Sequence, residues 1–339
     1  MTHRDVAQLA GVSTAVVSYV VNNGPRQTSP EVRERVLKAI AELDYHPNAF
    51  ARGLRARRTN TIAFIVHDYY AMTVFVAWYT AAMLTGLMEH LKSQGYYILV
   101  FPMSVDEDHR QLEQLLRSGR LDGIVLRLVQ QPPASDRLLE TIVDSQVPCV
   151  CIEQPAAPRF GFSSVTYNDQ DGAYEATRYL LDQGHRRIAH LCGEHNYGSA
   201  RARLAGYSKA LTDRGLAVDE ALISRGSWNH ATVAGSIEQF LGLDQPPTAI
   251  VAASDELAFA AIEELHRRHH RVPEQIAVVG FDDSALASRV TPPLTTVRIP
   301  LHQLGQRAGE LILAAVEADH APAPSNEVLP VTFIRRASA

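Results

Sequence analysis

The chain has few of the features that mark secreted, membrane or disulfide-bonded proteins. It contains only 3 cysteines among 339 residues, and an odd number does not suggest a disulfide framework. Because no secretion signal is evident, we expect Cys149, Cys151 and Cys192 to be buried, reduced thiols of a cytoplasmic protein. The sequence has no run of 18 or more apolar residues, so no membrane-spanning segment is predicted.

Signatures of catalysis and of cofactor binding are also missing. The sequence lacks the phosphate-binding loop GxxxxGK with a following Ser or Thr, and it lacks the GxSxG nucleophile elbow. The histidines of the RRHHR run near 266–270 lack metal-ligand spacing and are most simply exposed on a helix. Asp282, Asp283 and His195 form no nucleophile–base set at a diagnostic spacing. The sequence therefore predicts no enzyme, no cofactor and no metal.

Charge is divided unevenly along the chain. Residues 1–58 hold nine Lys and Arg against five acids, a net of +4, whereas the whole chain carries −5, so the remainder carries −9. A basic N-terminal part on an acidic body favours approach of that part to a phosphate backbone.

Residues 2–23, THRDVAQLAGVSTAVVSYVVNN, have the pattern of a DNA-binding helix-turn-helix. Thr2 is suited to cap the first helix, and Gly11 suits the tight turn. The inward face of this helix is expected to comprise Val6, Leu9 and Ala10. A small helical hairpin without a DNA role is the alternative interpretation.

The second helix of this segment is capped by Ser13 and packs inward through valines. Its expected inward positions are Val17, Val20 and Val21. Thr14, Ala15, Ser18 and Tyr19 then face outward, as the base-reading surface of a recognition helix does. Ser29-Pro30-Glu31 is a helix start that predicts a third helix closing a three-helix core.

The body from about residue 60 alternates short apolar strands with helical patterns, which predicts α/β lobes with doubly wound parallel sheets. The expected strands are 62–66, 97–101, 123–128, 147–152, 188–191, 249–253 and 276–281, with 328–334 as a final strand. Leu84, Leu87, Met88 and Leu91 form one expected helix stripe. A body of some 280 residues suits two lobes, and ligands of such sheets bind at the carboxyl ends of strands.

Polar side chains gather just after these strands. The candidates are Arg203, Trp228, Ser254, Asp255, Asp282 and Asp283. A carboxylate can accept hydroxyl protons, an arginine fork can donate, and an indole can stack on a sugar face. The set suits a polar small molecule, most simply a carbohydrate. The alternatives are a capping role for Asp282, a bridge between lobes for Arg203 and a core position for Trp228.

Several ordered motifs resemble the lactose-repressor (LacI/GalR) family of bacterial transcription regulators. At the N-terminus these are RDVAQLAGVS, VVSYVVNN, SPEVRERVLKAIAELDYHPN and ARGLRARRTNTI. Toward the C-terminus they are HLCG, RARLAGY, SDELAFAAI, VVGFDDS and PPLTTVRIP. The resemblance covers essentially the whole chain and implies a helix-turn-helix head on a two-lobed, periplasmic-binding-protein-like body.

The resemblance implies a domain plan and DNA contacts. The head would span 1–46, the hinge helix and linker 47–59, and the effector-binding and dimerisation domain 60–339, with chain crossings near 161–163, 288–293 and 322–327. Thr14, Ala15 and Tyr19 would read bases. Asn48, Arg52 and Arg55 would contact DNA from the hinge, and Leu54 would be a minor-groove wedge, unless it is an ordinary linker residue. Val16 departs from the threonine of many members, so a phosphate contact would be missing.

The resemblance also assigns Arg203, Asp282 and Trp228 to effector binding, with Ser254 in a slot often filled by asparagine. The first-strand loop departs from the family, with Trp78 and Tyr79 nearest the family's aromatics. Arg127, if it faces the cleft, would favour an anionic ligand, although a surface arginine is an equal alternative. A purine, nucleoside or anionic corepressor therefore stays open beside the sugar.

The predicted function is a ligand-responsive repressor that binds a palindromic double-stranded DNA operator as a homodimer, with a tetramer left open. Ligand binding would close the cleft and change the hinge of each protomer. The sequence does not show whether the ligand raises or lowers DNA affinity, so an inducer and a corepressor both stay open. A transport solute-binding protein is a rival with the same body, but it would need an export signal.

Overall fold

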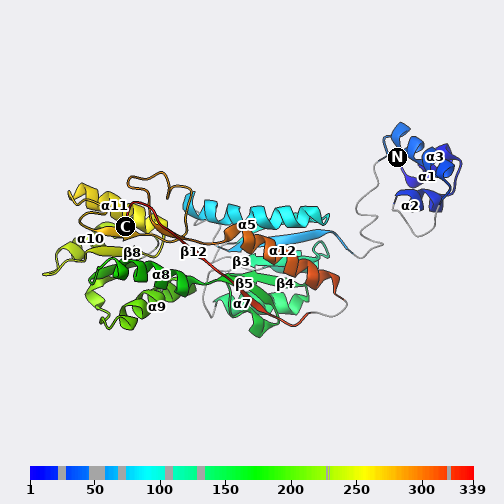
Figure 1. Cartoon of the computed structure of the whole chain (residues 1–339). Coiled ribbons are helices and arrows are strands. Elements are labelled where there is room, and N and C mark those ends of the chain that lie inside the picture. Colours follow the sequence, from blue (N-terminus) through cyan, green and yellow to red (C-terminus); the bar gives the residue numbers. More distant parts are fainter. Residues whose placement is uncertain are drawn as a thin grey trace. The chain divides into compact units, whose positions relative to one another are not determined.

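The structure is a computed structural model that describes residues 1–21, 28–45, 58–67, 74–103, 110–127, 134–226, 228, 230–318 and 322–339. The chain divides into two compact units, Met1–Asn60 and Thr61–Ala339. Each unit is described by itself (Figure 1).

The N-terminal unit contains helices α1 (His3–Ala10), α2 (Thr14–Val21) and α3 (Pro30–Glu42). Thr2 and Asp5 form a capping box, in which the Thr2 backbone N donates to Asp5 Oδ2 at 2.7 Å and Asp5 N donates to Thr2 Oγ1 at 3.4 Å. Gly11 has φ 62°, a left-handed turn conformation that glycine adopts without strain. Val16 N donates to Ser13 Oγ at 3.4 Å. Both predicted caps are therefore confirmed.

The core of this unit differs from the prediction at one helix position. Val6 and Ala10 are buried as expected, but Leu9 is 47% exposed and Ala7 is buried instead. Residues in a helix follow one another at about 100°, so a face centred between Val6, Ala7 and Ala10 leaves Leu9 on its edge. The buried residues of the other helices are Val17, Val20, Val36 and Ala39.

The body begins with lobe 1, built on a six-stranded parallel sheet with the order β11-β5-β4-β3-β1-β2. Its strands are β1 (Thr61–His67), β2 (Tyr97–Met103), β3 (Gly123–Arg127), β4 (Cys149–Ile152), β5 (Ser163–Tyr167) and β11 (Asn326–Leu329). Helices α5 (Val74–Ser93) and α12 (Leu301–Glu317) pack on one face, and α6 (Arg110–Arg117) and α7 (Ala134–Ser145) on the other.

Lobe 2 has a four-stranded parallel sheet with the order β7-β6-β8-β9. Its strands are β6 (Ile188–Cys192), β7 (Ile223–Arg225), β8 (Ala249–Ala252) and β9 (Ala277–Val279). Helices α8 (Asp169–Asp182) and α9 (Gly198–Asp213) cover one face, and α10 (Val233–Leu241) and α11 (Asp255–Arg267) cover the other. Short 3-10 turns lie at Ala157–Phe160, Glu220–Leu222 and His230–Thr232.

The inner strands of both sheets are buried on both faces, as expected for parallel sheets between helices. In β1, Ile62 and Phe64 pack toward α5 and α12, whereas Ala63 and Ile65 pack toward α6 and α7. The doubly wound parallel architecture predicted for the body is therefore confirmed. One prediction within it was wrong, because Met88 of the expected α5 stripe is 47% exposed and Met83 is buried in its place.

The chain passes between the lobes at positions that differ from the expected ones. β5 pairs with β4 inside the lobe 1 sheet, so the first crossing lies near Asn168, after 161–163. The second lies at 299–300, between β10 (Thr296–Arg298) and α12, after 288–293. The third lies at 330–331, after 322–327. In each case the expected position lies before or at the start of a strand that still belongs to the lobe that the chain is leaving: β5 and β11 in lobe 1, and β10 in lobe 2.

The final strand predicted over 328–334 is two strands in different sheets. β11 pairs with β5 in lobe 1, whereas β12 (Thr332–Ile334) pairs antiparallel with β10. Pro330 lies between them and has no backbone N–H to continue a ladder. The proline therefore ends one pairing at the point where the chain crosses.

Candidate functional site

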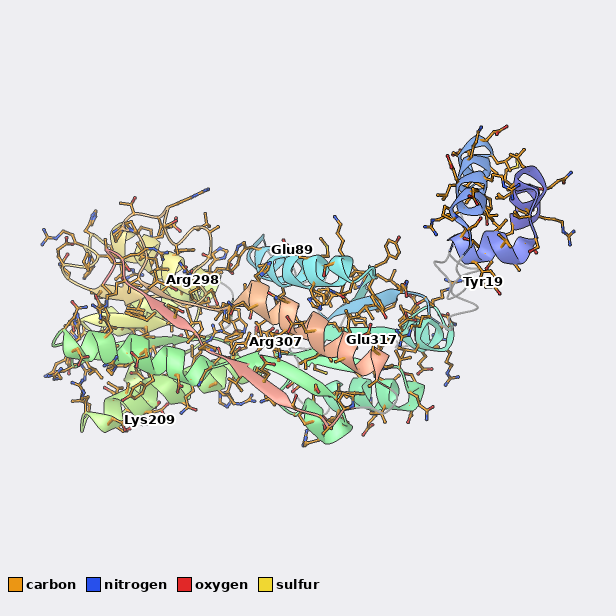
Figure 2. All side chains as sticks on the ribbon, turned by 45° about the vertical axis from the view of Figure 1, so that its right-hand side comes forward. Tyr19, Glu89, Lys209, Arg298, Arg307 and Glu317 are labelled. Atoms are coloured by element: carbon orange, nitrogen blue, oxygen red, sulfur yellow. The ribbon has the colours of Figure 1, made fainter. Side chains whose placement is uncertain are left out.

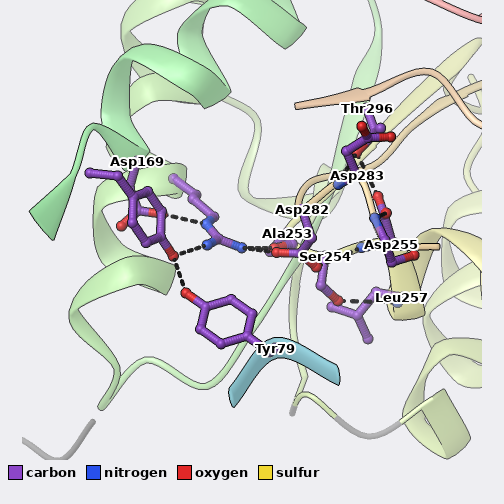
Figure 3. Close-up of polar contacts among 12 residues, drawn as sticks. Tyr79, Asp169, Ala253, Ser254, Asp255, Leu257, Asp282, Asp283 and Thr296 are labelled. Atoms are coloured by element: carbon purple, nitrogen blue, oxygen red, sulfur yellow. Dashed lines mark hydrogen bonds and ion pairs between the residues drawn. The ribbon is translucent and has the colours of Figure 1, made fainter. Parts of the chain in front are cut away.

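The carboxyl ends of the strands in lobe 1 and lobe 2 are joined by a chain of polar side chains, drawn in Figure 3. Tyr167, the last residue of β5, lies next to Arg203 of α9, and Asp282 follows β9. This is the edge at which ligands of open α/β sheets bind. The name "inter-lobe polar cluster" is used below for Arg127, Tyr79, Glu153, Tyr167, Asp169, Arg203 and Asp282.

Arg203 is the centre of the lobe 2 half of this cluster. It is only 3% exposed, and its Nε donates to Asp169 Oδ1 at 2.7 Å. One terminal nitrogen donates to Tyr167 Oη at 3.0 Å, and the other donates to the Ala253 carbonyl and lies 3.6 Å from Asp282 Oδ1. Arg203 therefore faces the ligand edge and also contacts the last residue of a lobe 1 strand.

Asp282 reaches Arg203 because the backbone after β9 turns sharply. Asp282 has φ 127° and Asp283 has φ 57°, both in the region that residues with a side chain seldom adopt. Strained backbone of this kind is typical of ligand sites. Asp282 Oδ2 also accepts the backbone N–H of Asp255 at 3.2 Å.

Ser254 and Asp255 lie beside this carboxylate at the start of α11. Ser254 is the helix cap, and its Oγ accepts the N–H of Leu257 at 3.2 Å. Asp255 is fully buried and accepts from Ser284 N at 2.7 Å and from Thr296 Oγ1 at 2.6 Å. Asp255 therefore holds the backbone of Ser284, two residues after Asp282, in place.

Trp228 supplies an aromatic wall and is only partly buried. The guanidinium of Arg203 lies 5.8 Å from its ring centre, and Tyr197 meets it edge-on at 6.0 Å. A side chain at Gly193 would overlap the indole, so the loop after β6 needs glycine there. The structure therefore brings together five of the six candidates, Arg203, Trp228, Ser254, Asp255 and Asp282, whereas the carboxylate of Asp283 binds Arg298 and Arg336.

The lobe 1 half of the cluster is organised by Glu153, which directly follows β4 and has φ 61°. Its carboxylate accepts Arg127 Nε at 2.9 Å, the hydroxyl of Tyr167 at 3.2 Å and the hydroxyl of Tyr79. The two tyrosine hydroxyls lie 2.9 Å apart. Arg127 is 8% exposed, so it is not a surface arginine.

Sequence reasoning did not single out Glu153, Tyr167 or Asp169. Their position directly after β4, at the end of β5 and at the start of α8 was the available signal. Because β5 was not predicted as a strand, Tyr167 at its end and Asp169 just after it were missed.

Burial determines the ionisation of these groups. It raises the pKa of Tyr79 and Tyr167 well above the usual value, so both hydroxyls stay protonated. Burial also raises the pKa of Asp169 and Asp282, against the attraction of Arg203. For Arg203 burial lowers the pKa, but Asp169, Tyr167 and Asp282 outweigh it and the net shift is upward.

The second site lies on the head. Thr14 and Ala15 are exposed at the start of α2, and Ser18 and Tyr19 are half-buried beside them; Tyr19 is labelled in Figure 2. Ser13 is exposed and caps the helix. The hinge candidates Asn48, Arg52, Leu54 and Arg55 lie outside the described residues.

Within the described ranges, none of the helices combines the length and the hydropathy needed to span a bilayer.

Comparisons with known proteins match both parts of the chain. The family described as bacterial regulatory proteins, lacI family, matches residues 2–48, and the periplasmic binding protein-like domain matches residues 177–339. The HTH-type transcriptional repressor PurR of Vibrio atlanticus (strain LGP32) is 32% identical over 322 residues, covering 94% of this chain and 93% of that protein.

Two solved structures are similar over the whole chain. The transcriptional regulator CelR–cellobiose complex has a TM-score of 0.74 and 31% identity, with 100% of both chains covered. The lac repressor dimer bound to operator and the anti-inducer ONPF has a TM-score of 0.82 and 26% identity, covering 100% of this chain and 98% of that one.

Proposed function

The chain belongs to the lacI family of bacterial regulatory proteins, and from this premise we propose that an uncharged, hydroxyl-rich ligand, most simply a carbohydrate, controls its binding to operator DNA. The ligand lies against Arg203, Asp282 and Trp228, and the operator meets the exposed start of α2. The protein is a DNA-binding transcription regulator of the repressor type, and the cytoplasm is where its DNA target lies.

The main support for this ligand class is the pairing of the two arginines in the inter-lobe polar cluster with carboxylates. Arg127 is bound to Glu153, and Arg203 is bound to Asp169 and lies beside Asp282. An anionic ligand would have to displace a carboxylate from one of them and would face the remaining carboxylates. A sugar hydroxyl can instead donate to a carboxylate and accept from an arginine.

Aromatic side chains support the same ligand class. Trp228 and Tyr197 lie on lobe 2, and Trp78 and Tyr79 lie on lobe 1 with ring centres 6.5 Å apart. An aromatic face packs well against the C–H face of a sugar ring. The structure of the similar regulator CelR is a complex with cellobiose, which agrees with this assignment. We assign the site to binding and not to catalysis, in line with the regulators that the chain resembles.

On the head, Ser13, Thr14, Ala15, Ser18 and Tyr19 form the proposed DNA-reading set. Thr14 and Ala15 are exposed at the amino end of α2, the part of a recognition helix that meets base edges. Asn48, Arg52, Leu54 and Arg55 keep their proposed hinge contacts, with Leu54 as a wedge.

The proposed dimer face is the β2 edge of lobe 1. β2 is the last strand of its sheet, and Tyr97, Leu99 and Val100 are 74%, 38% and 42% exposed. Met88 on α5, which packs against β2, is 47% exposed. An open edge strand with apolar side chains is normally covered by a partner. A second copy of the chain meets this need.

Asp282→Ala tests the ligand site. The purified full-length chain is titrated with its operator in the presence of galactose, cellobiose, hypoxanthine or glucose 6-phosphate, and operator affinity is read by fluorescence anisotropy. We expect a neutral sugar to change the operator affinity of the unmodified chain by about 5- to 150-fold. Asp282→Ala should bind operator equally well without ligand and should lose the response.

Asp213→Ala is the matched control, because Asp213 is an exposed aspartate on α9 that forms an ion pair with Lys209 of the same helix, away from the ligand edge. It should respond as the unmodified chain does. A normal response in Asp282→Ala would remove Asp282 from the site. A response to glucose 6-phosphate or hypoxanthine but not to the sugars would overturn the ligand class.

A further inference from the structure

The side chains of Asp282 and Asp283 contact different parts of lobe 2. Two successive residues with positive φ, at 127° and 57°, place the carboxylate of Asp282 against Arg203 and that of Asp283 against other partners. Such a backbone is maintained only where surrounding contacts hold it. The strand end after β9 therefore connects the ligand edge with a second region of lobe 2.

That second region is the pair of strands through which the chain leaves and re-enters lobe 2. Asp283 Oδ2 accepts Arg298 Nε at 2.6 Å, and its Oδ1 accepts a terminal nitrogen of Arg336, also at 2.6 Å. Arg298 ends β10, and Arg336 follows β12. The side chain of Asp283 is only 7% exposed, and hydrogen bonds between a carboxylate and a guanidinium are stronger than neutral ones.

Further hydrogen bonds make the two strands and the loop one unit. The second terminal nitrogen of Arg336 donates to the Leu294 carbonyl at 2.8 Å. Thr296 of β10 donates to the buried Asp255 at 2.6 Å, and Asp282 N donates to the Val297 carbonyl at 2.7 Å. Figure 3 shows Thr296, Asp283, Asp255 and Asp282 grouped on this side. A displacement of the loop must therefore move β10.

These strands are the ones that connect lobe 2 with lobe 1. β10 continues through 299–300 into α12 of lobe 1, and the crossing at 330–331 leads from β11 of lobe 1 into β12. Arg298, the last residue of β10, is labelled in Figure 2. One carboxylate thus binds Arg298 at the end of β10, which leads into one crossing, and Arg336 after β12, the strand that follows another crossing.

We propose that Asp283 is the positioning residue that couples the ligand loop to the lobe crossings, by clamping Arg298 and Arg336 so that the crossing strands follow the loop. This inference rests on the proposed function, because it needs a ligand at Asp282. Without the clamp the lobes still fold, but the angle between them is no longer tied to the loop. The mechanism is a shift between two states of the same chain.

The test measures the distance between the lobes in the full-length chain without ligand. Spin labels are attached to cysteines introduced at Glu140 of α7 and Glu263 of α11, which are both exposed; the three native cysteines are buried. Labelled chain is diluted into excess unlabelled chain, so that a dimer carries one labelled protomer. Double electron–electron resonance then gives the distribution of distances.

We expect Asp283→Asn to widen the distribution by several ångströms relative to the unmodified chain. Arg298→Gln, which removes one arm of the clamp at a side chain that is 56% exposed, should give a smaller widening and keeps the test open if Asp283→Asn does not fold. Asp213→Asn, which breaks an ion pair within one helix, should leave the distribution unchanged.

A merely structural Asp283 would lower the melting temperature of the variants and leave the distances unchanged. Unchanged distances in the folded variants would overturn the proposal. A distribution that widens equally in Asp213→Asn would overturn it as well. Failure of the proposed function is a separate result, because it would appear as a lack of ligand or operator binding in the unmodified chain.

Discussion

At the scale of single residues, the buried carboxylate of Asp255 makes the stability of the fold depend on pH. It is fully buried, and a side chain at Gly280 would come within 2.5 Å of its Oδ1. Burial raises the pKa of Asp255 to about 7, although hydrogen bonds from Thr296 and Ser284 act in the opposite direction. The folded state therefore holds a proton that the unfolded chain releases near its ordinary value of 3.8.

We predict that Asp255 lowers the free energy of unfolding as the pH rises from about 4 to about 7, whereas His190, whose pKa burial lowers from 6.5 to about 4, acts in the opposite direction. In that window Asp255 holds more of its proton in the folded chain than in the unfolded chain, so its contribution to stability decreases with pH. Urea unfolding at several pH values measures the slope. Relative to the unmodified chain, Asp255→Asn should have a less negative or more positive slope over this pH range. Asp282, whose pKa burial also raises, still contributes to the slope in the same direction as Asp255.

An equal slope in Asp255→Asn and in the unmodified chain would show that Asp255 does not hold the proton. A more negative slope in Asp255→Asn than in the unmodified chain would contradict the argument from burial.

The sequence identified the site residues whose role follows from the chain order alone. Asp282 directly follows an apolar strand, and Ser254 precedes a helix, so both could be placed at the carboxyl edge in advance. The partners of Arg127 and Arg203 could not, because Glu153 and Asp169 meet them only through the packing of four different elements. For that reason Arg127 had a surface alternative that the structure removes.

At the scale of secondary-structure elements, α5 and α12 approach each other closely through two glycines. A side chain at Gly86 would overlap the backbone carbonyl of His302, and one at Gly305 would overlap that of Met83. Neither backbone can move without the rest of its helix. The contact of these helices is part of the main hydrophobic core of the body.

We predict that Gly305→Ala lowers the free energy of unfolding by about 1–3 kcal/mol, the usual cost of overpacking. Urea unfolding at neutral pH gives the value. Gly235→Ala on α10 is the matched control, since nothing lies near its Cβ position; it should be neutral or stabilise by up to about 1 kcal/mol. Equal effects of the two substitutions would refute the close approach.

Elements with strong patterns could be predicted, and those made by long-range pairing could not. The apolar runs of β1, β3 and β8 and the capped helix α1 follow local rules, and the structure has them where expected. β10 and β12 are three residues each and pair with each other across the chain. Nothing local distinguishes such strands from loops, so the lobe crossings were placed too early.

At the scale of the whole molecule, the two edges of the lobe 1 sheet differ in what they expose. β2 ends the sheet on one side with Tyr97, and β11 ends it on the other with Val328, which is 50% exposed. The proposed dimer uses the β2 edge, so the two edges provide a matched pair of substitutions.

We predict that Tyr97→Glu weakens dimerisation by about ten- to a hundredfold, because a charge is buried in an apolar contact. Val328→Glu should leave the dimer intact. Analytical ultracentrifugation over a range of concentrations measures both. A dimer that survives Tyr97→Glu and is lost in Val328→Glu would place the interface on the opposite edge.

The central claim is that this chain reads a palindromic operator under the control of a small ligand. Selection of double-stranded DNA by the purified full-length protein, with and without a pool of metabolites, tests it most directly. The account predicts enrichment of two inverted half-sites, about one helical turn apart, in at least one condition, with a difference between conditions. Enrichment of no sequence in either condition would contradict it.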